Sequence, residues 1–341
     1  MAQQKIIPVR FVYRSESMVP LMSIMENAGI WKQHGIDVRD FRYSDDPLDS
    51  EEQLLDGGID FIFGNHVSPY MRLAHGEPMV CLAQTENWLH QWVATAENVT
   101  DLRQLQDKTV VTVPLMENGK FSGHGNGNKI LLLELEGLDT KRMEFMHPKE
   151  AGNPVEAVRD GKAAACFVAP ERAERAIEAG LKIHRLPPMP MVHSITFTTM
   201  HPRLQQDEDF AERMMKVLVD ATAFFKTKKD ESLELLKNPV SPFRSANDYQ
   251  RLVEHYEEHA DEYETKPYPR AEAIINVHKL ACMVYPEAKT VNPLELWDTQ
   301  TLRQIHSTGY VDSLYGGKER VTSDIERVLH RGTHDDEDDD D

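Results

Sequence analysis

The sequence predicts an α/β protein with two lobes, built on mixed, mostly parallel sheets flanked by helices. Apolar strand-like runs alternate with helical segments from residue 6 to residue 226, and this alternation occurs in two successive stretches. A chain of 341 residues also has room for two domains. We therefore expect lobe 1, with additional C-terminal helices, at 1–92 and 193–317, lobe 2 at 93–192, and an acidic, disordered tail at 318–341.

In the first lobe, apolar runs predict strands at 6–13, 36–43, 61–63 and 79–84. Helices are expected at 20–28, at 50–55 and after residue 68. In the first of these helices, apolar side chains recur on one face, namely Leu21, Ile24, Met25 and Ala28.

The second lobe repeats the alternation, with strands expected at 108–113, 144–146, 163–168 and 181–186. Its helices are expected at 129–137, 155–161 and 170–179, and a polar, glycine-rich loop at 117–128. Segment 192–199 is expected to return to lobe 1, followed by an amphipathic helix at 210–226. Prolines then separate helices expected at 232–236, 246–262, 270–284 and 293–307.

The charge balance argues against nucleic-acid partners. The chain has 38 basic and 57 acidic side chains and a formal net charge of −19. Seven of the acids form the terminal run 335–341, so the rest of the chain carries about −12. No basic stripe with interleaved aromatic residues is present, and we expect no nucleic-acid partner.

Cysteine usage and the N-terminal segment predict a cytoplasmic location. The three cysteines are widely spaced and form no metal or redox pattern, so we expect them to be small, buried, apolar residues: Cys81, Cys166 and Cys282. The first five residues lead directly into a strand-like run without an apolar export signal, and no later segment reads as a membrane span. Removal of an export signal would instead indicate a periplasmic protein, with a transporter permease as partner.

The stretch 61–72 is the first candidate for a ligand site. An apolar strand ends at Gly64-Asn65, and His66 and Ser68 follow where a helix begins. Open α/β sheets bind ligands at the carboxyl ends of their strands, and helix N-termini favour anions. An ordinary strand-to-helix turn, with Asn65 as the cap and a solvated His66, explains the same residues.

Three segments of the first lobe resemble a known family. They read AGIWKQHGIDV at 28–38, LLDGGIDFIFGN at 54–65 and AHGEPMVCLAQ at 74–84. In this order they are similar to the type II periplasmic-binding-protein fold, in the branch of sulfonate-, taurine- and thiamine-pyrimidine-related proteins. The resemblance covers about residues 6–225. It implies a two-lobed periplasmic-binding-protein-like fold.

The resemblance also implies a binding function without a cofactor. Most relatives deliver sulfonates, nitrate or pyrimidine precursors to transporters. The expected ligand is therefore a small organic anion, such as a carboxylate, a sulfonate, or a pyrimidine or other aromatic or heteroaromatic acid, held in a cleft between the lobes. The sequence does not set the oligomeric state.

Lobe 1 offers candidate ligand groups on loops at strand ends. Arg14 and Ser17 precede a helix, where a guanidinium, a hydroxyl and backbone N–H groups suit an anion. A surface arginine and a helix-capping serine are the alternative. The ring of Trp88 could stack on a ligand or pack within the protein. The lobe 1 candidates are Tyr13, Arg14, Ser17, Asn65, His66 and Trp88.

Lobe 2 offers the loop 117–128, in which glycines allow close backbone approach to a ligand. Its spacing matches neither a Walker loop nor a dinucleotide fingerprint. Glu171 follows a strand and suits a donor on the ligand, although complementing a helix dipole explains it as well. The candidates in this lobe and on the returning segment are Glu117, Gly123, His124, Asn126, Glu171 and His193.

The histidines of these loops raise the question of a metal. His66, His124 and His193 are all expected at one cleft, but no pair of them has ligand spacing on one element. The chain has 15 histidines, so such a group arises easily by chance. We expect no metal.

The alternative function is that of a cytoplasmic lyase on the same scaffold, acting on an aromatic acid. His66 and Arg72 are similar in position to a histidine and an arginine of the aromatic desulfinase. His66 would then be an acid or base of near-neutral pKa. The desulfinase cysteine is missing, because its loop holds Ser15 and Ser17. The cysteine-rich segment and the cofactor-binding lysine of the thiamine-pyrimidine synthase are missing too.

Overall fold

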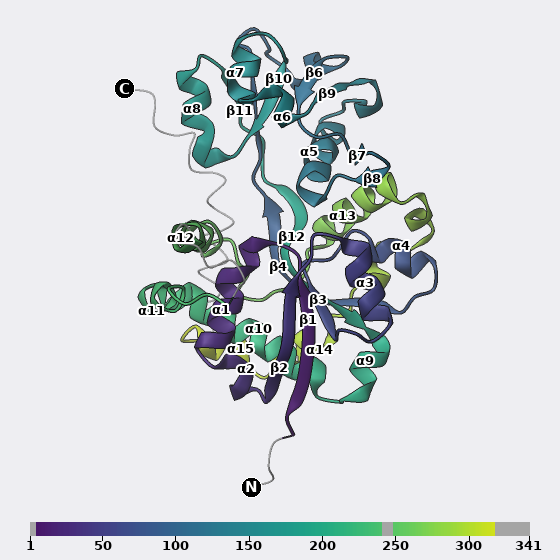
Figure 1. Ribbon diagram of the computed structural model, residues 1–341, viewed down its shortest axis with the longest axis vertical. Helices are drawn as coiled ribbons and strands as arrows, with labels where there is room; N and C mark the ends of the chain where they lie inside the picture. The colour runs from purple at the N-terminus through teal and green to yellow at the C-terminus, as the bar shows by residue number, and fades with distance from the viewer. Residues whose placement is uncertain (1–4, 241–247, 318–341) are drawn as a thin grey trace. The chain divides into compact units, whose positions relative to one another are not determined.

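The computed structural model describes residues 5–240 and 248–317, apart from the side chains of Glu171, Ser194 and Asp248 (Figure 1). The chain forms two compact units. Unit 1 takes its described residues from Met1–Asn87, Met191–Val277 and Glu287–Asp341, and unit 2 from Trp88–Pro190 and His278–Pro286. The predicted tail at 318–341 lies outside the described residues.

Unit 1 is built on a five-stranded sheet in the order β2-β1-β3-β12-β4. β1 runs parallel to β2 and β3, and β12 runs antiparallel to β3. The chain leaves unit 1 within β4 and returns within β12. The strands are β1 (Ile7–Tyr13), β2 (Ile36–Tyr43), β3 (Phe61–Phe63), β4 (Met79–Leu89) and β12 (Met189–Met200).

Aromatic residues on neighbouring strands form the centre of this sheet. The ring centroids of Phe11 and Phe61 lie 4.7 Å apart, and those of Phe61 and Phe197 lie 4.8 Å apart, both pairs stacked. All three side chains are buried. Each such pair contributes about 0.5–1.5 kcal/mol beyond the burial of its area, so the strands are held in register by their side chains.

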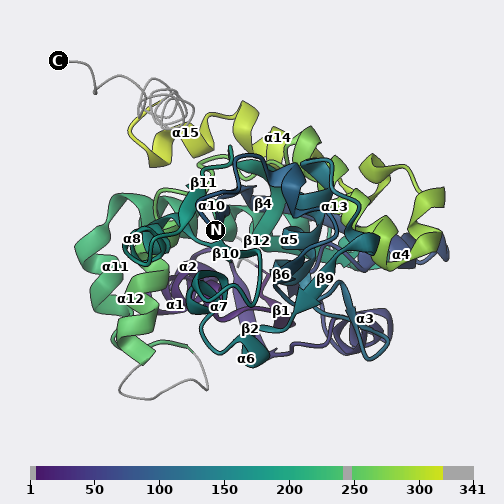
Figure 2. The same cartoon turned by 90° about the horizontal axis from the view of Figure 1, so that it is seen from above.

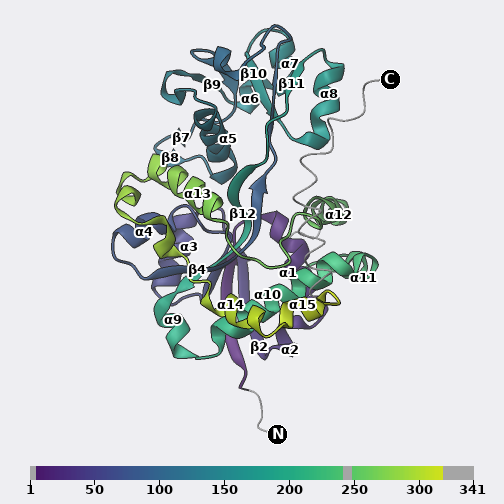
Figure 3. The same ribbon diagram turned by 180° about the vertical axis from the view of Figure 1, so that it is seen from behind.

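Helices cover both faces of the unit 1 sheet. The helices α1 (Val19–Asn27), α2 (Ile30–Gln33) and α10 (Phe210–Thr227) lie on one side, and α3 (Pro47–Leu55) and α4 (Pro69–Ala74) on the other (Figures 1 and 3). Figure 2 shows α1 and α3 on opposite sides of β2. The remaining helices are α9 (His201–Gln206), α11 (Lys229–Leu235), α12 (Asp248–His259), α14 (Gln300–Ser307) and α15 (Tyr310–Leu314), while α13 (Ala271–Val284) continues into unit 2.

Unit 2 has a second five-stranded sheet, in the order β11-β5-β10-β6-β9, and a two-stranded ribbon, β7-β8. β6 is parallel to β9 and β10, whereas β5 is antiparallel to β10 and β11. The strands are β5 (Trp92–Thr95), β6 (Thr109–Val111), β7 (Met116–Glu117), β8 (Lys120–Phe121), β9 (Glu144–Met146), β10 (Ala165–Val168) and β11 (Lys182–His184). The helices are α5 (His124–Leu135), α6 (Pro148–Ala151), α7 (Pro154–Arg159) and α8 (Ala173–Glu178).

Several segments differ from the prediction, and no strand was expected at β5 or helix at α6 and α9. The expected loop at 117–128 contains the β7-β8 ribbon, and α5 begins at His124 rather than Lys129. Gly123 precedes this helix with φ +98°, a conformation that glycine adopts without strain. The helix expected at 293–307 is broken into a 3₁₀ turn, Pro293–Leu296, and α14, because Trp297 is extended and forms a bridge with Cys81.

The cysteines have little reactivity where they are buried. Burial raises the pKa of Cys81 to about 12 and that of Cys166 to about 11, so both thiols stay protonated at neutral pH. Cys282 is only half-buried, and its Sγ lies 3.6 Å from His278 Nε2. Among the helices in the described ranges, none has both the length and the hydropathy needed to cross a membrane.

Candidate functional site

The candidate site of unit 1 lies where β1 and β3 end. The two strands are parallel and Tyr13 pairs with Phe63, so Arg14 and Gly64 leave the sheet side by side. Gly64 has φ +86°, and a Cβ atom there would lie 2.0 Å from Met18 Cε and 3.3 Å from Arg14 Cβ. Glycine is favoured at this position because the positive φ strains any other residue, and an added side chain would also have to displace the Met18 methyl.

Two nitrogens of the Arg14 guanidinium have no hydrogen-bond partner among the described residues. Within the described part of the chain, its Nε and Nη1 atoms are buried and form no hydrogen bond. Burial lowers the pKa of Arg14, and nearby groups, led by Glu51, oppose that shift. Arginine nonetheless stays protonated in proteins. A buried donor without a partner costs about 1–3 kcal/mol, and a bound anion would remove that cost.

His66 is buried beside this group and is neutral. Its Nδ1 lies 2.9 Å from Oγ1 of Thr196, and that hydroxyl donates to Oε1 of Gln84. The Nδ1 atom must then be the donor to Thr196, which leaves Nε2 as the basic nitrogen. Burial, followed by the charges of His193 and Arg14, lowers the pKa of His66 to about 3. The near-neutral pKa expected from the sequence is wrong, because that expectation assumed an imidazole in contact with water.

Gln84 connects His66 to a second pair of histidines. Its Nε2 donates to the backbone carbonyls of Glu86 and His193. The two oxygens of the Glu86 carboxylate contact His193 Nδ1, at 2.9 Å, and His259 Nδ1, at 2.5 Å. Burial raises the pKa of Glu86, but the charges and hydrogen bonds of His259 and His193 outweigh it and lower the pKa to about 2. Glu86 is therefore an ionised carboxylate between two histidines.

Asn65, Ser68 and Arg72 belong to a separate network around Glu51. Asn65 Nδ2 and Arg72 Nε each lie 2.7 Å from the Glu51 carboxylate, and Ser68 Oγ also donates to it. Burial raises the pKa of Glu51, and these donors oppose that shift. The Asn65 side chain is thus directed at Glu51 rather than at a ligand.

Arg72 is fully engaged within the protein. Besides Glu51, it contacts Glu52 at 2.7 Å and Glu77 at 3.4 Å. Three carboxylates leave its guanidinium no role as an anion clamp, so we assign Arg72 to the stability of the loop rather than to a ligand or a substrate. The cation with unused donors at this strand end is Arg14.

The other lobe 1 candidates are tied to the local structure. Tyr13 is fully buried, and its ring packs against those of Phe41 and Tyr43. Ser15, and not Ser17, caps the 3₁₀ turn Glu16–Met18, because Ser15 Oγ accepts from the Ser17 backbone N–H. Trp88 is half-buried at the end of β4 and belongs to unit 2.

In unit 2, three of the predicted residues lie at the start of α5. Gly123 precedes the helix, and His124 and Asn126 lie in its first turn, where Asn126 Nδ2 donates to the Ser122 carbonyl. Glu117 is exposed on β7, with an oxygen 3.9 Å from His147 Nε2. The backbone of Glu171 lies in the 3₁₀ turn Pro170–Arg172, but its side chain lies outside the described residues.

Three further polar side chains of unit 2 were not among the predicted site residues, although two of them lie in the expected loop 117–128. Asn128, Thr112 and Ser122 all have buried polar atoms that make no hydrogen bond within the described ranges, and in Asn128 both Nδ2 and Oδ1 are affected. Thr112 follows β6 directly, and the other two border the glycine-rich turn. The available signal was the position of Thr112 and Ser122 directly after strands, whereas Asn128 lies within α5. Neutral donors and acceptors of this kind suit the uncharged part of a ligand.

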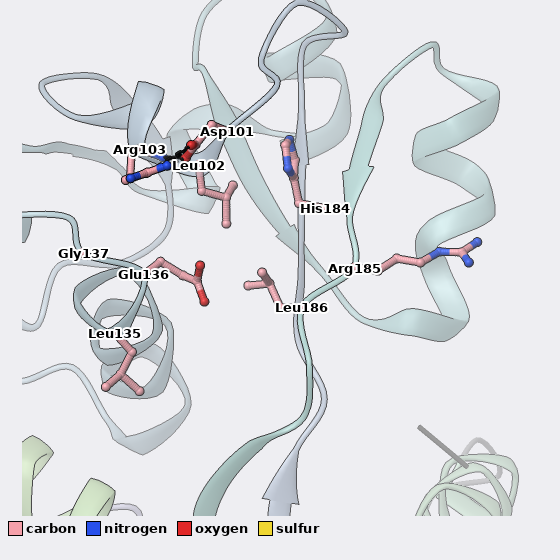
Figure 4. Close-up of a pocket in the computed structure, with 9 residues that line it drawn as sticks. All are labelled: Asp101, Leu102, Arg103, Leu135, Glu136, Gly137, His184, Arg185 and Leu186. Atoms are coloured by element: carbon pink, nitrogen blue, oxygen red, sulfur yellow. Dashed lines mark hydrogen bonds and ion pairs between the residues drawn. The ribbon is translucent and has the colours of Figure 1, made fainter. Parts of the chain in front are cut away.

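A cavity of about 740 Å³ lies elsewhere on unit 2 (Figure 4). Arg103 at its wall is paired with Asp101, His184 Nε2 lies 3.0 Å from Thr95 Oγ1, and the Arg185 guanidinium lies over the Trp92 ring. Figure 4 shows the Arg185 side chain directed away from the other lining residues. No predicted site residue lines this cavity, and its Arg103 is already paired with Asp101.

Comparison with known proteins identifies the fold. No family model matches the chain, and no curated protein does. Among solved structures, it is similar to a putative sulfonate ABC transporter periplasmic sulfonate-binding protein, SsuA, from Methylobacillus flagellatus KT, with a TM-score of 0.60 and 10% identity over 90% of this chain and 96% of that one. The chain has the fold of the periplasmic binding proteins. The predicted fold class is therefore confirmed.

Two further structures support this assignment. The periplasmic aliphatic sulphonate binding protein SsuA from Escherichia coli has a TM-score of 0.54 and 14% identity, over 85% of this chain and 90% of that one. The periplasmic nitrate-binding protein NrtA from Synechocystis PCC 6803 has a TM-score of 0.52 and 12% identity, over 90% of each chain. At these identities the likeness concerns the fold alone.

Proposed function

We propose that this protein binds a small organic anion, with Arg14 of unit 1 as the principal anion-binding residue. The observation that supports this most directly is the protonated guanidinium with two buried donors and no partner in the described ranges. A protein gains stability by pairing such a group internally, as Arg72 is paired. An unpaired cation at the carboxyl end of parallel strands instead favours an external anion.

The fold agrees with this proposal. The similar structures include proteins named for sulfonate binding and for nitrate binding, all of which take small oxyanions. Carboxylates and sulfonates present two or more oxygens to a planar guanidinium, so a bidentate contact with Arg14 is the expected mode of recognition. His66 would contribute hydrogen bonding from the adjacent strand end.

A lyase with His66 as acid or base is the weaker alternative. An imidazole with a pKa of about 3 is a poor base at pH 7 and is not in the imidazolium form that a general acid needs. The tautomer fixed by Thr196 and Gln84 suits a stationary hydrogen-bonding group. The cytoplasmic location and a transporter partner remain predictions.

The test is a thermal-shift screen of alkanesulfonates, aromatic carboxylates and pyrimidine carboxylates, followed by calorimetric titration of each hit. Replacement of Arg14 by Met should weaken binding by about 10- to 100-fold, because one charged hydrogen-bonding group contributes about 1.5–3 kcal/mol. Arg103→Met is the matched control, since it removes an exposed arginine of unit 2 that is paired with Asp101.

Recovery of the compound unchanged after prolonged incubation supports binding, whereas a decarboxylated or desulfonated product would support the lyase. The proposal fails if no anion binds to the wild-type protein, or if Arg14→Met and Arg103→Met bind the hit equally well.

A further inference from the structure

We propose that His255, Glu258 and His259 of α12 form a binding site for a divalent transition-metal ion such as Zn²⁺. Each of the three side chains offers one ligand atom, and these atoms all lie within 4.8 Å of one another. His255 and His259 are one helical turn apart, and Glu258 is on the same face. Imidazole and carboxylate are the ligands that Zn²⁺ takes in sites of mixed nitrogen and oxygen donors.

His259 is held in a fixed orientation by residues outside the proposed ligand set. Glu86 Oε1 lies 2.5 Å from its Nδ1 atom as an ion-pair contact, so Nε2 is the nitrogen that we assign to the metal. Its ring stacks on that of Tyr263, with centroids 5.6 Å apart and planes 11° apart. A carboxylate on the second nitrogen of a metal-binding histidine is the usual outer partner in zinc sites. Glu86, whose position the proposed anion site does not explain, is therefore placed to serve as this outer partner.

The helix that carries the three residues is anchored to the core. Tyr256, the residue after His255 in α12, is buried, and its hydroxyl donates to the Phe225 carbonyl at 2.7 Å. Its ring lies 4.3 Å from the Phe225 ring, measured between centroids. The positions of His255 and His259 along the turn are thereby fixed before any ion binds, which reduces the entropic cost of assembling the ligands.

The site is open on one side. The side chain of His259 is 11% exposed, whereas those of His255 and Glu258 are 27% and 49% exposed. An ion can therefore reach the buried histidine from solvent. The negative charges of Glu258 and Glu262 act on the same ring and would attract a cation. Three protein ligands leave a position of a tetrahedral ion for water or an anion.

The sequence carried a signal for this site that the sequence reasoning did not use. Residues 255–259 read HYEEH, so two histidines lie four residues apart in a segment already expected to be helical. The expectation of no metal rested on His66, His124 and His193 alone. Of these three, His193 is connected to the proposed metal site, because it contacts the same Glu86 carboxylate as His259.

The competing explanation is that Glu86 and His259 form only a buried ion pair. The test uses the full chain without a polyhistidine tag, stripped with a chelator and dialysed. Zn²⁺ binding is measured by competition with a chromophoric chelator, and Co²⁺ is titrated with the visible spectrum as readout. We expect one ion per chain and the intense visible bands of four-coordinate Co²⁺.

Loss of an outer partner of a metal ligand weakens metal binding by about 10- to 100-fold, and we expect a loss of that size for Glu86→Gln. His255→Ala removes a ligand itself and should weaken Zn²⁺ binding by more. His201→Ala, which removes an exposed histidine of α9, should bind as the wild type does. Far-ultraviolet circular dichroism checks that each variant is folded. The proposal is overturned if the wild-type chain binds no stoichiometric Zn²⁺, or if His255→Ala and His201→Ala bind it equally.

Discussion

Arg14 and Arg72 belong to the same unit, and the buried Glu51 interacts electrostatically with both. They differ in how many of their donors are paired. Arg72 contacts three carboxylates, whereas Arg14 has two buried donors and no hydrogen-bond partner within the described residues. Buried charge is normally paired, because leaving it unpaired costs several kcal/mol. We therefore distinguish an arginine that stabilises the fold from one that is available to a ligand. Four measurements test this distinction.

The largest effect is expected from Arg72→Met. Removing this cation leaves the buried Glu51 carboxylate without its charge partner, so the free energy of unfolding should fall by about 3–5 kcal/mol. Urea denaturation followed by circular dichroism measures it. The double variant Glu51→Gln/Arg72→Met should recover part of the loss. An Arg72→Met protein as stable as the wild type would mean that the network around Glu51 does not hold the loop.

His66 should make the protein sensitive to mild acid. Its pKa is about 3 in the folded chain and near 6.5 when unfolded, so the unfolded chain binds more protons between these values. Stability is therefore fully present above pH 6.5 and is lost as pH falls towards 3. When the pH falls from 7.5 to 5, His66 should therefore lower the free energy of unfolding by about 2 kcal/mol.

The measurement is the urea midpoint at pH 7.5 and pH 5 for the wild type and for His66→Gln, which keeps an N–H donor for Thr196. The loss of stability on acidification should be smaller in the variant. Equal losses would show that His66 is accessible to water in the folded chain.

Arg14→Met should have the opposite sign from Arg72→Met. In the absence of ligand, the substitution removes two buried donors that lack partners, so the free energy of unfolding should rise by about 1–3 kcal/mol. The gain in stability together with the loss of anion binding would distinguish Arg14 from a structural residue. A destabilised variant would indicate that Arg14 serves the fold, as Arg72 does.

The smallest effect extends the comparison to neutral groups in unit 2. Asn128 has no hydrogen-bond partner in the described ranges, whereas Asn126 donates to the Ser122 carbonyl at 2.8 Å. Asn128→Leu should therefore leave stability unchanged or raise it by about 1 kcal/mol, while Asn126→Leu should lower it by about 1 kcal/mol. Thermal unfolding of the two variants, side by side, measures the difference. Equal destabilisation would place Asn128 with the structural residues.

Much of the fold was predictable from local sequence. The strand ending at Phe63 and the amphipathic helix at Phe210–Thr227 were expected within one or two residues of their observed bounds. Both depend on short-range patterns of apolar residues, which the chain shows directly. The helix expected at 293–307 was wrong because it is broken by a contact between Trp297 and Cys81, residues far apart in the sequence.

The sequence by itself determined where polar groups emerge from the sheets, since the carboxyl end of a strand can be read from an apolar run followed by Gly64, Asn65 and His66. Only the tertiary structure decided what these groups do. Arg72 is occupied because α3 brings Glu51 to it, and Glu86 reaches His259 across 173 positions of the chain. Pairing of buried charges depends on packing between distant segments, and within the described ranges that packing leaves two buried donors of Arg14 without a hydrogen bond.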